Sequence, residues 1–273
     1  MITLIYGRVG TVTTLSGGTS EGFLPPDDTC PPTKAPRMRL LIPALLTVAA
    51  FQVPIGFAAD EPAFYDPAEK QIEGWTIKVD PQLLAKENEE VATQAFTALA
   101  NHLQRVKYIV PKQRCEQLQR LPIWLELHGA LASMQYHPDR GWLVANKHDP
   151  RLEKHVHIPR AKELYDPQMW AKHPYVVLHE LAHAFHDQVL SFDHPAVVSA
   201  YENAREKKLY DEVLLYTGQK VRHYALTNHK EYFAESTEAY FGVNDFYPFV
   251  RAELREHDPT MFMLLEEIWG PVR

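Results

Sequence analysis

The chain has 273 residues, a formal net charge of −7 and an ordinary globular composition, with 45% hydrophobic and 23% charged residues. This length is enough for one substantial catalytic domain, and the negative charge gives no electrostatic support to a nucleic-acid partner. The two cysteines, Cys30 and Cys115, cannot build a cysteine-rich zinc site or a disulfide scaffold.

The first sixty residues are predicted to precede the folded domain. Residues 1–37 are rich in Gly, Pro, Ser and Thr, which is typical of a disordered extension. Residues 38–59 run from basic to apolar to small side chains, the order of a secretory signal peptide, so Met38 is a candidate start beside Met1. The apolar run has about fourteen residues, short of the ~20 that span a bilayer. We therefore expect a secreted or periplasmic protein rather than an anchored one.

Residues 60–273 are predicted to form one domain, because no linker or repeat divides them. Trp75–Val79 has strand composition, and apolar residues at helical spacing from Leu84 to Val106 predict a helix. Leu121–His128 alternates like a strand, and Ser133–His137 is a candidate partner for it. Glu153–Ile158 is predicted to be an edge strand, because charged residues precede its apolar face.

The second half of the domain is predicted to be mostly helical. Strands first and helices later indicate an α+β fold. The expected helices are Pro174–Leu190, one beginning at Pro195, Asn228–Phe241 with Gly242 after its end, and one or two within Pro248–Trp269; a hairpin is expected around Thr217-Gly218.

The segment His179-Glu180-Leu181-Ala182-His183 has the H-E-x-x-H pattern. On a helix, a four-residue step places both imidazoles on one face, from which they can reach one tetrahedral Zn²⁺. Glu180 is rotated by about 100° and can take a proton from an attacking water. The apolar flanks predict a buried helix, on which ionisable groups are costly unless something such as a metal compensates them.

Zinc needs a third protein ligand. The extended pattern that would supply it locally fails at His186 and Val189, so His186 is expected to support a ligand or to lie at the surface. Glu231, Glu235 and Glu238 recur along one helix face. Their repulsion is tolerable if Glu231 binds the cation and Glu235 accepts a hydrogen bond from a ligand histidine. Glu231 is therefore the favoured ligand, with Glu235 as the alternative.

Tyr224 lies just before the predicted ligand helix, where a loop can point its hydroxyl inward. A hydroxyl directed at a developing oxyanion would contribute about 3 kcal/mol of transition-state stabilisation. The alternative is that Tyr224 is an ordinary packed tyrosine.

At these residues the sequence resembles the catalytic domain of anthrax toxin lethal factor and its relatives. The likeness covers His179–His183 and the segment from Tyr224 through Thr227-Asn228 to Glu231-Tyr232-Phe233-Ala234-Glu235, all in the second half of the domain. The resemblance implies that His179, His183 and Glu231 bind zinc, that Glu180 is the general base and that the Tyr224 hydroxyl stabilises the oxyanion. Nothing resembles the toxin's translocation-binding domain.

The sequence therefore predicts a secreted zinc peptidase with a zincin-like α+β domain. An edge strand, here Glu153–Ile158, is expected to pair with an extended peptide or protein substrate. Two alternatives stay open: a zinc hydrolase acting on a non-peptide bond, and a non-catalytic binding protein that keeps the fold. Intact Glu180 argues against the second, because a binding scaffold has no need of the base.

Overall fold

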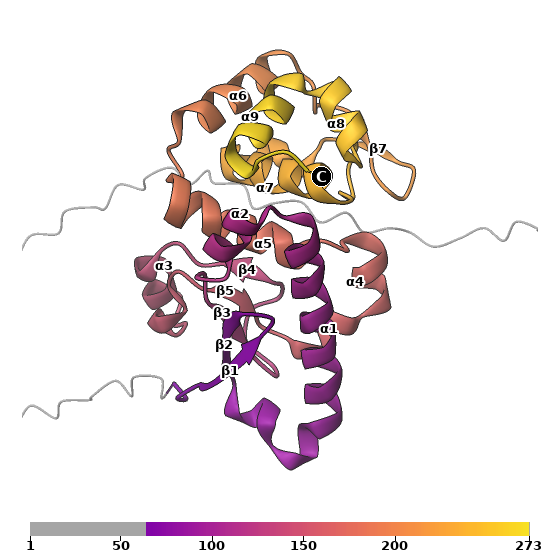
Figure 1. Ribbon diagram of the computed structural model, residues 1–273. Helices are drawn as coiled ribbons and strands as arrows, with labels where there is room; N and C mark the ends of the chain where they lie inside the picture. Colours follow the sequence, from indigo (N-terminus) through magenta and orange to yellow (C-terminus); the bar gives the residue numbers. More distant parts are fainter. Residues whose placement is uncertain (1–63, 273) are drawn as a thin grey trace, which may run out of the picture. The chain divides into compact units, whose positions relative to one another are not determined.

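Strands lie early in the chain and helices dominate its second half in the computed structural model, which describes residues 64–272 (Figure 1). This order confirms the predicted α+β class. The predicted extension (1–37) and signal peptide (38–59) lie outside the described residues. The strands are β1 Ala68–Ile72, β2 Trp75–Val79, β3 Ile123–Leu125, β4 Gln135–Tyr136, β5 Val156–Ile158, β6 Val213–Leu214 and β7 Lys220–Val221. The α-helices are α1 Glu89–Ile109, α2 Lys112–Leu118, α3 Arg140–Ala145, α4 Pro167–Lys172, α5 Val176–Phe185, α6 Pro195–Glu206, α7 His229–Phe241, α8 Arg251–His257 and α9 Pro259–Trp269.

The main sheet has the order β1-β2-β3-β5-β4. β2, β3 and β5 are parallel, and β1 and β4 pair antiparallel at the two edges. The prediction that Glu153–Ile158 is an edge strand is wrong, because β5 is paired on both sides and all three of its residues are buried. The charged residues that suggested an edge, Glu153 and Lys154, belong to the turn before β5. The edge of the sheet next to β5 is formed by β4. This strand pairs with β5 and not with Leu121–His128 as expected.

The main core includes buried residues of the sheet, α1 and α5, and it continues into α6, α7 and α9. A second, smaller cluster of Trp124, Leu143 and Leu152 involves α3, a helix that the sequence did not predict. The Asp139 carboxylate accepts a hydrogen bond from the Trp142 amide and caps α3. Asp139 therefore marks the start of a short helix.

The C-terminal helices hold α7 against α5. Asp258 is buried, caps α9 and accepts hydrogen bonds from the hydroxyls of Tyr210 and of Tyr232 on α7. α7 ends at Gly242 as predicted, but for a different reason from the one expected. The φ angle of Gly242 is −154°, outside the left-handed range of a glycine cap, and a Cβ there would lie 2.1 Å from the Tyr175 ring. A close approach just before α5 requires the glycine.

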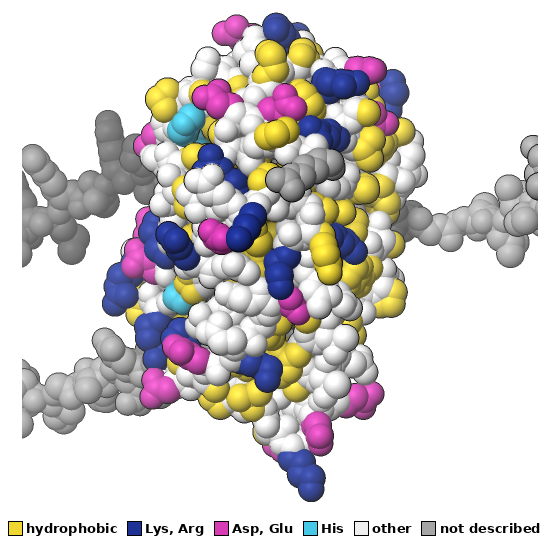
Figure 2. All heavy atoms as spheres, in the orientation of Figure 1, with side chains coloured by type: hydrophobic (Ala, Val, Ile, Leu, Met, Phe, Trp, Pro, Cys, Tyr) yellow, Lys and Arg dark blue, Asp and Glu magenta, His cyan; other side chains and the backbone are white. Residues whose placement is uncertain are grey.

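Few histidine side chains reach the surface on the face drawn in Figure 2, although the chain contains 14. Lysine, arginine and acidic side chains are interspersed there. Among the histidines of the described region, seven are buried: His102, His137, His157, His179, His183, His186 and His223. Within residues 64–272, no helix combines the length and the apolar character needed to cross a bilayer.

Candidate metal centre

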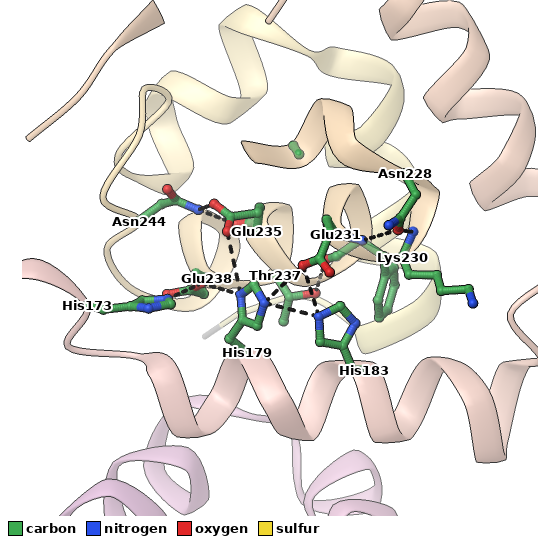
Figure 3. A network of polar contacts seen from close by, with 12 residues as sticks. His173, His179, His183, Asn228, Lys230, Glu231, Glu235, Thr237, Glu238 and Asn244 are labelled. Carbon is green, nitrogen blue, oxygen red and sulfur yellow. Dashed lines mark hydrogen bonds and ion pairs between the residues drawn. The ribbon is translucent and has the colours of Figure 1, made fainter. Parts of the chain in front are cut away.

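Helix α5 carries His179, Glu180 and His183, as the H-E-x-x-H pattern predicts. All ten of its residues are buried. The helix lies between the sheet and α7, so its apolar residues join the main core. Its two histidines point across to α7 (Figure 3). After Phe185 the chain continues in a π-helical turn, His186–Leu190.

Helix α7 brings Glu231 to the two histidines. The Asn228 side chain caps this helix by accepting hydrogen bonds from the amides of Lys230 and Glu231, at 2.9 and 3.0 Å. The cap fixes Glu231 in the first turn, where the positive end of the helix dipole favours a carboxylate. The helix predicted over Asn228–Phe241 is thereby confirmed, with Asn228 as its N-cap residue.

Three side-chain atoms from the two helices converge on one point. His183 Nε2 lies 3.1 Å from His179 Nε2 and 3.1 Å from Glu231 Oε2, and His179 Nε2 lies 3.3 Å from the same oxygen (Figure 3). Two ligand atoms on a tetrahedral zinc, each 2.0–2.1 Å from the ion, are about 3.3 Å apart. The spacing and chemistry of the three donors therefore fit a divalent cation such as zinc.

Hydrogen bonds between Glu231 and His179 change the pKa of both groups. Burial disfavours the ionised Glu231, but hydrogen bonds from His179 and His183 outweigh burial and hold the pKa of Glu231 far below its usual range. Burial also disfavours protonated His179, but hydrogen bonds to Glu231 and Glu238 raise its pKa well above 6.5. Without a cation, His179 thus carries the positive charge that its two carboxylate neighbours require.

This coupling predicts that metal affinity rises with pH. A cation binding to the Nε2 atom of His179 must displace a proton, because a ligand imidazole is neutral and the pKa of this one is raised. Zinc affinity is expected to fall as the pH is lowered toward 6.5, by up to about tenfold per pH unit, because one proton is released per ion. Competition against a chelator of known affinity at each pH would measure the slope. An affinity that does not change over this range would contradict the assignment of His179.

The hydrogen bond predicted for Glu235 is made by Glu238 instead. Glu238 Oε1 accepts from His179 Nδ1 at 2.7 Å, whereas Glu235 Oε1 is 3.7 Å away. A seven-residue step falls about 20° short of two full turns, whereas a four-residue step overshoots one turn by about 40°. Glu238 is therefore more nearly in line with Glu231 than Glu235 is. The sequence analysis placed all three glutamates on one face and assigned this hydrogen bond to Glu235, which is wrong.

Glu235 points to other partners. Its Oε2 accepts a hydrogen bond from Asn244 Nδ2 at 2.8 Å. Burial, reinforced by the negative charge of Glu238, raises the pKa of Glu235. Glu235 belongs to neither of the two groups of converging donors in the described region, which are His179-His183-Glu231 and His173-His179-Glu238. His173, for which the sequence predicted no role, thus lies beside the ligand candidate His179.

Glu180 and Tyr224 line the same cavity of about 680 Å³ as the three donors. Burial raises the pKa of Glu180, although both neighbouring histidines oppose the shift, so its carboxylate has more basic character than an exposed one. Tyr224 is half exposed. Burial and the charge of Glu231 raise the pKa of its hydroxyl, which thus remains a proton donor at neutral pH.

His186 is fully buried, so the part of the expectation that placed it at the surface is wrong. Its ring packs against Phe192 and Phe233, in the π-helical turn that follows α5. Neither ring nitrogen has a hydrogen-bond partner in the described region, so His186 makes no hydrogen bond to a candidate ligand there.

No family model, no curated protein and no solved structure matches the chain. The likeness to lethal factor therefore rests on the short motifs around His179 and Glu231. What the structure adds is a cluster of histidine and glutamate side chains that could hold a metal ion.

Proposed function

We propose that the chain is a zinc-dependent peptidase with a zincin-like domain. The observation that carries this proposal is the convergence of His179, His183 and Glu231 from two helices, at distances that suit one tetrahedral cation. Two histidines and a carboxylate are a ligand set used by catalytic zinc, which keeps a fourth position open. Secretion is proposed from the composition of residues 38–59 alone, and N-terminal sequencing of exported protein would test it.

The roles of the other residues follow from their places in the cavity. A bound zinc ion would polarise the scissile carbonyl and lower the pKa of a water molecule to about 7. Glu180 would take a proton from the attacking water as the water oxygen bonds to the carbonyl carbon, and would pass that proton to the amine nitrogen as the C–N bond breaks. The Tyr224 hydroxyl donates a hydrogen bond to the oxygen on which negative charge develops.

The edge strand β4 supplies a place for an extended peptide. Ser133, Met134, Gln135 and Tyr136 line the cavity beside the metal centre. Only one side of β4 is paired, and that side faces β5. The other side can hydrogen-bond with a substrate main chain, and this supports our proposal of a peptide substrate over other hydrolysable groups. Tyr136 is held by a 2.6 Å hydrogen bond to Asp187, which fixes the strand next to the end of α5.

Cleavage of unfolded casein is the direct test of this function. The purified protein is expected to cleave casein, to lose this activity when a chelator removes the metal, and to regain it on addition of one equivalent of zinc. Mass spectrometry of the products would show whether peptide bonds are hydrolysed. Stoichiometric zinc without cleavage of casein or of peptide libraries would favour the non-catalytic alternative. Turnover of esters alone would favour a hydrolase of another bond.

A further inference from the structure

A buried carboxylate joins two histidines behind the metal centre. Glu238 is fully buried on α7, and its Oε1 atom accepts hydrogen bonds from His179 Nδ1 at 2.7 Å and from His173 Nε2 at 2.8 Å (Figure 3). His173 lies in the segment between α4 and α5, outside the H-E-x-x-H motif. The three residues thus connect α5, α7 and the segment that leads into α5.

These contacts determine which nitrogen of His179 is free. A carboxylate can only accept, so the proton of His179 lies on Nδ1 when the ring is neutral. The Nε2 lone pair then faces His183 and Glu231, which lie 3.1 and 3.3 Å away. We propose that Glu238, itself held by His173, is a positioning residue that fixes the tautomer and the ring orientation of His179 for metal binding. The proposal rests on the metal centre of the proposed function.

The alternative reading of these residues is a second metal site, since His173, His179 and Glu238 also lie close together. Their spacing argues against it. Distances of 2.7 and 2.8 Å are typical of charge-assisted hydrogen bonds, whereas two ligands of one tetrahedral zinc are about 3.3 Å apart. His179 would also have to bind metal through both nitrogens and lose both ring protons.

His173 has its own part in this arrangement. Both histidines donate to the same oxygen of Glu238, so the second hydrogen bond fixes the carboxylate that orients the first ring. His173 also anchors the segment before α5, where the Val176 amide donates to the His173 carbonyl at 3.1 Å. Loss of the His173 donor would free the Glu238 carboxylate to rotate away from His179.

The test compares the zinc affinity of wild type with that of Glu238→Gln, measured by competition against a chelator. Glu238→Gln is expected to bind zinc 10–100-fold more weakly, the usual effect of removing a group that orients a ligand histidine. Thr237→Val is the matched control. Thr237 is buried in the same turn of α7 and bonds Phe233 and Trp269, but it contacts neither histidine. Loss of the Thr237 hydroxyl should lower the thermal stability of the metal-free protein and leave zinc affinity within about threefold of wild type.

Substitutions of His173 separate positioning from packing. His173→Gln retains an N–H donor and is expected to stay close to wild-type affinity, whereas His173→Phe is expected to weaken zinc binding. Adding His173→Phe to Glu238→Gln should cost little more, because both changes break one network. The visible absorption spectrum of the Co²⁺-loaded protein should change in Glu238→Gln and not in Thr237→Val.

Three outcomes would overturn this proposal. Glu238→Gln binding zinc as tightly as Thr237→Val would remove the positioning role. Two zinc ions per wild-type chain, falling to one in Glu238→Gln, would instead establish the second metal site. A wild-type chain that binds no zinc would refute the proposed function and the positioning role together, so the two failures are distinguishable.

Discussion

Glu180→Gln is expected to lower the rate of peptide hydrolysis by about 10²–10⁴-fold, the range that a general base contributes. Glutamine has nearly the shape of glutamate but cannot take a proton from the attacking water. Glu180 makes no hydrogen bond to His179, His183 or Glu231 among the contacts in the described region, so the three metal donors should keep their places. The Glu180→Gln substitution should therefore lower turnover without lowering the zinc content.

The measurement combines kcat with the metal content of the same preparation. Zinc in Glu180→Gln should remain at one equivalent, and peptide binding should persist. A fall in zinc content would mean that Glu180 acts on the metal and not on the proton. Turnover within a few fold of wild type would mean that another group, such as Glu235, is the base. Glu235→Gln in parallel tests that case, because it removes another carboxyl group that lines the cavity and is not one of the three metal donors.

The helices of the site could be predicted because their signals are local. Apolar residues on both sides of His179 predict a buried helix, and Asn228 and Gly242 mark the two ends of the other. Each signal depends on neighbours within a few residues in the chain. The placement of His179, Glu180 and His183 on α5 follows from the same local pattern.

The edge of the sheet could not be predicted, because strand order depends on contacts far apart in sequence. β4 and β5 have only two and three residues, too few for alternation to show which faces are covered. β1 was missed because only its last residue, Ile72, is buried. It pairs through its main chain with β2, and that pairing leaves no apolar pattern in the sequence.

The sequence could not show that Glu238, and not Glu235, is the partner of His179. The reason is again that the answer depends on contacts far apart in sequence. Helical spacing placed both on the face that carries Glu231, but only the packing of α7 across α5 brings Glu238 to Nδ1. His173 gave no signal of its own, since it lies in a loop with no ligand spacing. Neither residue could be assigned until the two helices were placed together.

Glu231→Gln is expected to reduce zinc affinity by more than about 100-fold, the upper end of what the loss of a supporting residue costs. The carboxylate supplies both a donor atom and the negative charge that two neutral imidazoles lack. An amide oxygen is a weaker donor for zinc and leaves the cation without a counter-charge. Turnover should fall with zinc occupancy and recover only partly at high zinc concentration.

Glu235→Gln is the matched comparison, because Glu235 is one turn further along α7 and is more buried than Glu231. Burial and the charge of Glu238 raise the pKa of Glu235, which favours its neutral acid, and glutamine mimics a neutral acid closely. Zinc binding through Glu235 would require its deprotonation against that shift. Metal content after dialysis should therefore fall in Glu231→Gln and persist in Glu235→Gln. The reverse pattern would mean that Glu235, and not Glu231, is the third metal ligand. It would refute the convergence of His179, His183 and Glu231 on one cation, on which the proposed function depends.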